Sequence, residues 1–554
     1  MSREVGKLLV ANRGEIAVRV FRTCRELGIA TVAVAEPADA GSLHARSAGE
    51  TVVIVSYLDA AEHLRAALES GARSIHPGYG FLSENPEFAE AVETAGLVWI
   101  GPPPAALRAG GDKLAAKRIA RAAGVPVVES GEPGALGFPL LVKSAAGGGG
   151  RGMRVVRSAA ELEPALDAAR REAGAAFGDD TVFCERYVER ARHVEVQLLA
   201  DADGVLALGE RECSIQRRHQ KVLEESPSPG IDEGLRTALC DAAVRFASAI
   251  GYRGAGTAEF MVAGRDFFFL ELNARIQVEH PVTEAVTGRD LVADQIRIAQ
   301  GLPLVEAEAA RERSQRGAGI RPHAEEDGHA IEVRLYAEDP RTFLPQAGRI
   351  ERLRLPGGVR VDAGVEEGDE VGTRYDAMIA KLIAHGGTRE EAIATLDKAL
   401  AETEVEGVVT NLPFLRWLLA HRAFRAGDTT TDFLTRYPPL TPMPARLPAV
   451  VWAGPFRINL ASPLVAAPPD LDDPAHAHLP GEEGAAVAAP MPGTVIRVNV
   501  AAGDAVEARE PLVVLEAMKM EMPLLAPRAG TIRTVHVAQG DTVARGSVLV
   551  ELED

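Results

Sequence analysis

Two carboxylates and an amide stand on two apolar runs that are joined by a short turn. Glu259 lies in residues 256–261, while Glu271 and Asn273 lie in residues 267–273, with the turn sequence AGRD between the runs. The pattern predicts a β-hairpin on which Glu271 and Asn273 share one face and Glu259 lies opposite them. Carboxylates on an apolar hairpin are costly to bury without a cation, and oxygen ligands of this kind suit Mg²⁺. We therefore interpret the three residues as metal ligands, with an incidental acidic pair as the alternative.

The residues that follow the second run add a base and a cation. Arg275, Gln277 and Glu279 alternate in the sequence, so all three side chains face one way if this stretch is extended. Arg275 and Glu279 could form a structural ion pair. Beside a metal site, the same residue types supply what bicarbonate chemistry needs, namely a proton acceptor and a positive charge.

A strand-like run that ends in Lys143 precedes a glycine-rich loop. Residues 140–143 read LLVK, and residues 144–153 read SAAGGGGRGM. Glycines leave the backbone N–H groups unobstructed, so such a loop can close over phosphates, although no Walker A sequence follows it. A flexible linker is the alternative, but the apolar strands predicted on both sides favour a phosphate lid. The glycines concerned are Gly147, Gly148, Gly149 and Gly150.

Residues 211–221, RECSIQRRHQK, contain five potential cations in eleven positions. A solvated face is the usual explanation of such a run. In a chain with a formal net charge of −19, local cations are needed wherever an anion binds, so we favour an anion site.

A lone lysine, Lys519, stands between two methionines in the sequence EAMKM. The surrounding residues repeat after thirty-seven positions, because Gly493 and Thr494 recur as Gly530 and Thr531. Each half reads as short strands broken by Gly-Asp turns, which predicts a small antiparallel β domain with internal two-fold symmetry. Lys519 falls in the join between the halves, where a tight turn would expose it. An ordinary strand or turn is the alternative.

At the N-terminus, residues 7–12 predict a strand, residues 13–27 a helix ended by Gly28, and residues 31–34 a second strand. This βαβ order predicts a parallel sheet. No GxGxxG run occurs there, so the sequence supports no dinucleotide site.

The composition narrows the possible classes. A length of 554 residues predicts three or four domains, and no apolar run reaches the ~18 residues of a membrane span. The acidic balance disfavours nucleic acid and anionic membranes as partners. The N-terminus carries no signal-peptide pattern, and four scattered cysteines predict buried thiols in a reducing compartment without disulfides. We expect a cytoplasmic protein.

Together, these motifs carry a family resemblance. Residues 11–16, ANRGEI, residues 75–85, IHPGYGFLSEN, the glycine loop and the acidic hairpin resemble the biotin carboxylase branch of the ATP-grasp fold, from residue 7 to about residue 437. Residues 485–554 resemble the biotinyl carrier domain of biotin-dependent carboxylases. Lipoyl domains share that fold but lack the Met-Lys-Met setting. Ala274 stands where the family usually has threonine, and Arg186 where it usually has lysine.

The resemblance implies roles for named residues. Glu279 would deprotonate bicarbonate, whose attack on ATP gives carboxyphosphate, while Arg275 and Arg334 would hold bicarbonate and stabilise the biotin enolate, and Lys221 would help to bind bicarbonate. Lys519 would carry biotin, and Glu259, Glu271 and Asn273 would bind Mg²⁺ or Mn²⁺. The residues expected at ATP are Lys113, Lys143, Gly147, Gly148, Gly149, Gly150, Glu185, Val188, His193, Gln216 and His219.

The expected fold class is α/β multidomain. It comprises a parallel α/β N-terminal domain at 1–112, an ATP-grasp domain at 113–318 with a lid at about 125–190, and an α+β C-terminal carboxylase domain at 328–437. A Pro/Ala-rich linker at 438–484 and an all-β carrier domain of the biotinyl/lipoyl type at 485–554 follow. An extended linker of this kind suits a carrier that visits two active sites.

We therefore expect the α subunit of a biotin-dependent acyl-CoA carboxylase, a ligase of fatty acid biosynthesis that uses acetyl-CoA or propionyl-CoA. The chain ends at the carrier, so a separate carboxyltransferase β subunit would accept the carboxyl group. A biotin protein ligase and a homo-oligomer within a larger α/β complex are the other expected partners. Two alternatives stay open: a carboxylase subunit for a non-CoA acceptor such as pyruvate or urea, and a biotinylated scaffold with an inactive ATP site.

Overall fold

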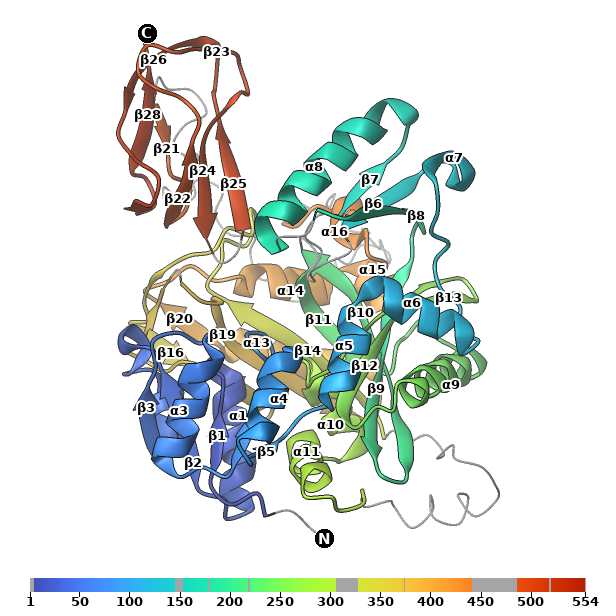
Figure 1. The fold of residues 1–554 in the computed structure, drawn as a ribbon. Coiled ribbons are helices and arrows are strands. Elements are labelled where there is room, and N and C mark those ends of the chain that lie inside the picture. Colours follow the sequence, from blue (N-terminus) through green and yellow to red (C-terminus); the bar gives the residue numbers. More distant parts are fainter. Residues whose placement is uncertain are drawn as a thin grey trace, which may run out of the picture.

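The computed structural model describes residues 4–144, 153–177, 180–217, 220–304, 327–372, 374–440, 486–517 and 520–553. Lys519, the four consecutive glycines, His219 and nearly all of the predicted linker lie outside these residues. Figure 1 shows a large body from which two smaller units project, one made of a helix and short strands (the projecting unit) and the other the all-β C-terminal unit. None of the described helices is long and apolar enough to cross a membrane. All four cysteines are buried, as predicted, and none of them forms a disulfide.

The N-terminal unit is a five-stranded parallel sheet of order β3-β2-β1-β4-β5. The predicted βαβ unit is confirmed, because α1 joins β1 to the parallel strand β2. The apolar face of α1 packs through Ile16, Val20 and Phe21 onto that sheet. The strands and helices are β1 (Leu8–Val10), α1 (Gly14–Glu26), β2 (Thr31–Ala35), η1 (Pro37–Asp39), α2 (Leu43–Ser47), β3 (Glu50–Val53), α3 (Ala60–Ser70), β4 (Ser74–His76), α4 (Pro86–Thr94), β5 (Val98–Trp99) and α5 (Pro104–Gly111).

The body is built on one eight-stranded antiparallel sheet of order β13-β12-β9-β10-β11-β14-β19-β17. Strands of the predicted ATP-grasp and C-terminal domains join in it through the pair β11–β14. Charged residues from strands far apart in the sequence therefore meet on one surface. The strands are β9 (Arg192–Asp201), β10 (Gly204–Arg217), β11 (Gln220–Ser226), β12 (Gly254–Ala263), β13 (Asp266–Asn273), β14 (His329–Tyr336), β17 (Arg360–Ala363) and β19 (Met378–Gly386).

Helices and short strands complete the body. Helix α9 packs on the sheet through Phe246, which stacks near Phe269 of β13 with ring centroids 4.4 Å apart. Helices α13 and α14 bury Leu396, Phe414 and Leu418 in the core on the C-terminal side. The elements are α6 (Lys113–Ala122), α9 (Glu233–Ala249), α10 (His280–Thr287), α11 (Leu291–Ala299), β15 (Gly348–Arg349), β16 (Arg352–Arg354), β18 (Glu370–Val371), α13 (Arg389–Glu402), β20 (Glu404–Glu406), α14 (Leu412–Ala420), α15 (Arg422–Arg425) and α16 (Phe433–Arg436).

The projecting unit contains the glycine-loop strands. Its sheet, of order β7-β6-β8, is antiparallel and is covered by α8. Leu140 and Val142 of β6 point into its small core, which places Lys143 on the opposite face. Its elements are α7 (Pro133–Leu136), β6 (Leu140–Ser144), β7 (Arg154–Val156), α8 (Ala159–Phe177) and β8 (Val182–Arg186).

The C-terminal unit has the predicted two-fold symmetry. Its two four-stranded sheets have the orders β21-β28-β26-β23 and β25-β24-β22-β27. A shift of thirty-seven residues relates β22 to β26, β23 to β27 and β24 to β28. The strands are β21 (Ala486–Ala488), β22 (Gly493–Val498), β23 (Ala505–Val506), β24 (Pro511–Ala517), β25 (Met520–Leu525), β26 (Gly530–Val535), β27 (Thr542–Val543) and β28 (Val548–Leu552).

The C-terminal unit touches the body at a small contact. Met491, with Met522 beside it, packs on Leu344, and Arg545 Nη1 donates a hydrogen bond to Gln346 Oε1 at 3.1 Å. Strands β24 and β25 pair up to Ala517 and Met520, the residues that flank positions 518 and 519.

Candidate functional site

The predicted acidic hairpin is present. Glu259 of β12 lies directly opposite Glu271 of β13, and Asn273 Nδ2 donates to Glu259 Oε1 at 2.9 Å. Burial, and after it the negative charge of Glu259, raises the pKa of Glu271. Its nearest fixed cation among the described residues is Lys113, whose Nζ lies 3.9 Å from a Glu271 oxygen. Glu259 is compensated by Lys221 and His193, whereas Glu271 has no cation as close among these residues.

This arrangement fits a divalent cation. Glu271 is under-compensated, and a cation between it and Glu259 would relieve the repulsion that raises its pKa. Oxygen donors of this type are those that Mg²⁺ prefers. Asn273 Oδ1 accepts from Arg275 Nη2 at 2.7 Å, so this oxygen would have to exchange that partner for a metal.

A dense group of buried charges adjoins the hairpin, and we call it the carboxylation cluster: Glu195, Lys221, Glu259, Glu279 and Arg334. Lys221 Nζ contacts the carboxylates of Glu195, Glu259 at 2.8 Å and Glu279 at 2.5 Å. Arg334 Nη2 donates to the second oxygen of Glu279 at 3.0 Å. Three of the four residues predicted to bind or activate bicarbonate are therefore in direct contact.

The cluster sets the ionisation of its base. Burial opposes the charge of Glu279, but Lys221 and then Arg334 outweigh it and hold the pKa of Glu279 well below its ordinary value. Burial also opposes the charge of Lys221, whose pKa its acidic neighbours, led by Glu195, hold well above the usual range. Both groups are thus fixed in their charged forms at neutral pH.

Arg275 differs from the expectation of an extended run. Residues 274–279 form no strand, and Glu279 is the N-cap residue of α10. Arg275 Nε donates to Glu84 at 3.0 Å, whereas Gln277 Nε2 donates to Glu259 at 2.9 Å. Gln277 and Glu279 thus both reach the group formed by Glu259 and Lys221, whereas Arg275 pairs with Glu84 and Asn273, although the segment is a turn and not an extended strand.

The predicted nucleotide residues of the projecting unit gather around Glu185. Lys143 Nζ lies 3.2 Å from one Glu185 oxygen, and Lys117 of α6 contacts the other. Burial, followed by the positive charge of Lys113, lowers the pKa of Lys143 to about 8. Burial and Lys143 likewise lower the pKa of Lys117 to about 7. Glu185 therefore serves as the counter-ion of two lysines, while Val188 lies in the segment after β8.

His193 and Gln216 lie beside the acidic hairpin. Gln216 Nε2 lies 2.8 Å from His193 Nδ1, and His193 Nε2 lies 2.9 Å from Glu259 Oε2. The two residues thus link the predicted nucleotide site to the predicted metal site.

Arg211 was counted among the cations of a predicted anion site, but its guanidinium binds buried side chains instead, and Glu195, Glu224 and Lys117 were assigned no role from the sequence. The fully buried Arg211 donates to Glu195 and Gln197, each at 2.7 Å, and to Gln277 at 2.9 Å, which fixes the walls around Lys221. Glu195 stands in an alternating run of polar and apolar residues, and no role was predicted for it. A carboxylate at an inward position of a buried strand nevertheless indicates that a cation from another part of the chain pairs with it. Glu224, which contacts Arg334, carries the same signal. The sequence around Lys117 gave no such indication, because Lys117 is one of several basic residues in the same helix.

Four known domain families match successive parts of the chain. Residues 4–107 match the biotin carboxylase N-terminal domain, and residues 112–307 match the ATP-binding domain of the carbamoyl-phosphate synthase L chain. Residues 332–436 match the biotin carboxylase C-terminal domain, and residues 485–552 match the domain described as biotin-requiring enzyme.

Individual relatives extend this result. The biotin carboxylase of Haemophilus influenzae is 46% identical over 452 residues, which cover 78% of this chain and 98% of that protein. The α subunit of mitochondrial methylcrotonoyl-CoA carboxylase from Arabidopsis thaliana is 46% identical, but the match spans only 61% of its length and 78% of this chain. A pyruvate carboxylase subunit of Methanothermobacter thermautotrophicus is also 46% identical, over 78% of this chain and 90% of that protein.

A solved structure agrees with the observed fold. The biotin carboxylase domain of Hydrogenobacter thermophilus 2-oxoglutarate carboxylase, in complex with MgADP, ADP and bicarbonate, has a TM-score of 0.74. It is 40% identical and covers 79% of this chain and 98% of that one.

The fold and the buried cluster define an ATP-grasp ligase that is joined to a small symmetric carrier unit. The chain belongs to the biotin carboxylase family, and its residues 485–552 form an additional biotin-requiring domain. Its reaction is the ATP-dependent carboxylation of biotin.

Proposed function

We propose that the chain is the α subunit of a biotin-dependent acyl-CoA carboxylase. It carboxylates biotin on Lys519 with bicarbonate and ATP, and a carboxyltransferase β subunit then transfers the carboxyl group to an acyl-CoA. The carboxylation cluster supports the first step, because Lys221, Glu279 and Arg334 meet beside the acidic hairpin. The relative from Arabidopsis thaliana, an α subunit that acts on a CoA thioester by name, supports the second.

Glu279 is the proton acceptor in this proposal. Lys221 and Arg334 keep it ionised, which makes it available but weakly basic. When an anionic substrate binds to the same two cations, they are shared, and the pKa of Glu279 rises toward that of an effective base. Glu279 then takes the bicarbonate proton, and the carbonate oxygen that is left attacks the γ-phosphorus as ADP leaves.

Other residues hold charge at the reacting atoms. Lys143 and Lys113 neutralise phosphate oxygens, and Arg334 holds the negative oxygen that develops during carboxyl transfer. Mg²⁺ at Glu259, Glu271 and Asn273 would supply charge neutralisation between phosphates. Biotin would supply the nitrogen atom that receives the carboxyl group, while phosphate leaves from carboxyphosphate and takes up the proton of that nitrogen.

ADP release by the purified chain tests the first step. We expect release that requires both bicarbonate and biotin, and we expect Glu279→Gln to lower it by roughly 10²-fold or more, as for loss of a general base. The exposed Glu26→Gln is the matched control and leaves the rate unchanged. Absence of ADP release would instead support the inactive-site alternative, and ADP release that ignores bicarbonate and biotin would mean that the ATP site acts on another acid.

The acceptor needs its own experiment. A non-CoA acceptor is the second candidate, because the pyruvate carboxylase relative is as similar as the CoA-directed one. The chain can be co-purified with its native partner and offered labelled bicarbonate with acetyl-CoA, propionyl-CoA, pyruvate or urea. Label in an acyl-CoA supports the proposal, whereas label only in pyruvate or urea products contradicts it.

A further inference from the structure

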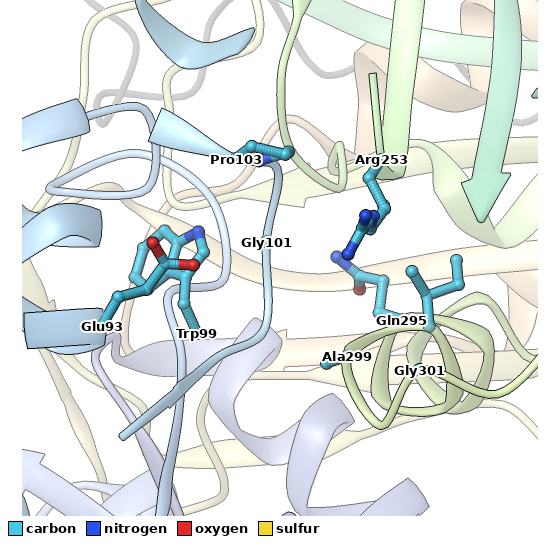
Figure 2. A pocket seen from close by; sticks show the side chains of 10 residues that line it. Glu93, Trp99, Gly101, Pro103, Arg253, Gln295, Ala299 and Gly301 are labelled. Carbon is cyan, nitrogen blue, oxygen red and sulfur yellow. The ribbon is translucent and has the colours of Figure 1, made fainter. Parts of the chain in front are cut away.

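A cavity outside the carboxylation cluster lies between the N-terminal sheet and the body. Its volume is about 240 Å³, just under the ~300–1,000 Å³ of pockets for drug-sized ligands. Trp99 and Pro103, at the end of β5 and in the loop after it, form one side, and Arg253 and Gln295 form the other (Figure 2). Ile298 also lines the cavity. The space suits a small metabolite that touches both parts of the molecule.

The amide of Gln295 is oriented by a buried histidine. Gly78 N–H donates to His76 Nδ1 at 3.0 Å, and burial lowers the pKa of His76 to about 4. A neutral imidazole that accepts at Nδ1 carries its proton on Nε2. His76 Nε2 therefore donates to Gln295 Oε1, which lies 3.1 Å away. With its oxygen engaged, the amide turns its nitrogen toward the cavity.

Donors converge on one side of the cavity without an acceptor. Figure 2 shows the Gln295 amide nitrogen and the Arg253 guanidinium turned toward one another. Within the described part of the chain, neither group has a hydrogen-bond or ion-pair partner beyond the contact of Gln295 with His76. Gln295 is only 4% exposed. A nearly buried N–H and an exposed guanidinium beside it can together bind an anionic oxygen between them.

The other residues that line the cavity indicate which kind of anion it can bind. Trp99 and Ile298 are 4% and 5% exposed and offer apolar surface. Glu93 lines the side of Trp99, opposite Arg253, and its carboxylate would repel a compact polyanion such as phosphate. The same carboxylate would attract a positive or hydrogen-bond-donating group at the far end of a ligand.

We propose that this cavity binds a small organic carboxylate. Its carboxylate group lies between Arg253 and the Gln295 amide, and its carbon skeleton lies on Trp99 and Ile298. A planar carboxylate can accept two hydrogen bonds from the fork of an arginine, and Glu93 disfavours the more highly charged phosphate. An amino group at the other end of the ligand pairs with Glu93.

Equilibrium dialysis of the full chain with labelled β-alanine, propionate and inorganic phosphate tests the site. We expect saturable binding of both carboxylates, tighter for β-alanine, and weaker binding of phosphate. Arg253→Met should weaken carboxylate binding roughly tenfold or more, because it removes the charged donor. Arg245→Met, which removes an exposed arginine of α9, should change nothing.

A second variant tests the role of the amide. Gln295→Glu keeps the shape of the side chain but puts a negative oxygen in the cavity, so it should abolish carboxylate binding. Trp99 fluorescence, measured with Trp417 and Trp452 replaced by Phe, should follow the same titration. Absence of saturable carboxylate binding, binding that survives Arg253→Met, or equal affinity for phosphate would each overturn the proposal.

Discussion

The carboxylation cluster and the C-terminal carrier unit are built in opposite ways. The cluster takes one charged residue from each of five elements: Glu195 of β9, Lys221 of β11, Glu259 of β12, Glu279 before α10 and Arg334 of β14. The carrier unit has an apolar core, and its predicted functional residue lies in one local sequence motif.

The difference follows from the cost of burying charge. A buried charge is tolerated only with its partners in place, so the cluster works as a unit and depends on the whole sheet. In the proposed function, the carrier needs only a stable small core and a lysine, Lys519, between the strands β24 and β25. Substitutions in the cluster should therefore change the rate of ATP cleavage and biotin carboxylation. Substitutions in the carrier should change only whether the attached biotin reaches the cluster.

The largest effect should come from Lys519→Arg. This variant offers no amine for an amide bond to biotin, so carboxyl label on the chain should disappear completely. ADP release with free biotin should stay unchanged, because the cluster is intact. Lys398→Arg, on the exposed face of α13, is the control for the same change of residue type. Label that remains on the Lys519→Arg chain would place the biotin elsewhere and break the comparison.

Leu515→Ala tests the carrier core. Leu515 is fully buried between the two sheets, and such truncations cost roughly 2–5 kcal/mol of unfolding free energy. We expect the carrier to become protease-sensitive while ADP release with free biotin is kept. Val548→Ala, at a position 40% exposed, should have little effect. If ADP release with free biotin were lost together with the protease resistance of the carrier, the two regions would fold as one unit.

Glu224→Gln tests the charge balance of the cluster through pH. Burial raises the pKa of Glu224 to about 7, although Arg334 opposes the shift, and Glu279, Lys221 and the directly opposed Glu332 also act on it. An unfolded glutamate has a pKa near 4.3. The folded chain therefore holds the Glu224 proton more tightly than the unfolded chain does, and this difference stabilises the fold at low pH. The stabilisation is lost as the pH rises toward 7. The glutamine variant lacks that loss.

Denaturant unfolding between pH 5 and pH 8 measures the effect. The free energy of unfolding of the variant should rise relative to that of the unaltered chain, by at most about 1.4 kcal/mol per pH unit. Glu233→Gln, at an exposed side chain of α9, should give a parallel curve. A constant difference for Glu224→Gln would mean that Glu224 is ionised throughout.

The smallest effect should come from the contact between the two regions. Arg545→Met removes the hydrogen bond to Gln346, which is worth about 1 kcal/mol, so carboxylation of the attached carrier should change by about fivefold at most. Carboxylation of free biotin should not change. Arg497→Met, at an exposed carrier position, is the control. A loss as large as that of Lys519→Arg would mean that this contact is required for delivery.

The sequence predicted those parts of the fold that depend on neighbouring residues. The hairpin with Glu259 opposite Glu271, the first βαβ unit and the repeated halves of the carrier were all readable from apolar alternation and turn residues. The direction of Arg275 was not, because the turn before α10 interrupts the alternation.

By itself, the sequence determined which residue types are available and which short elements carry them, because periodicity and turn chemistry are local. Only the tertiary structure decided that Glu195 and Lys221 meet, that Lys117 shares Glu185 with Lys143, and that Gln295 turns its amide toward Arg253. Those contacts depend on strand order and on the packing of separate units, and they must all form together because a buried charge without its partner is strongly destabilising.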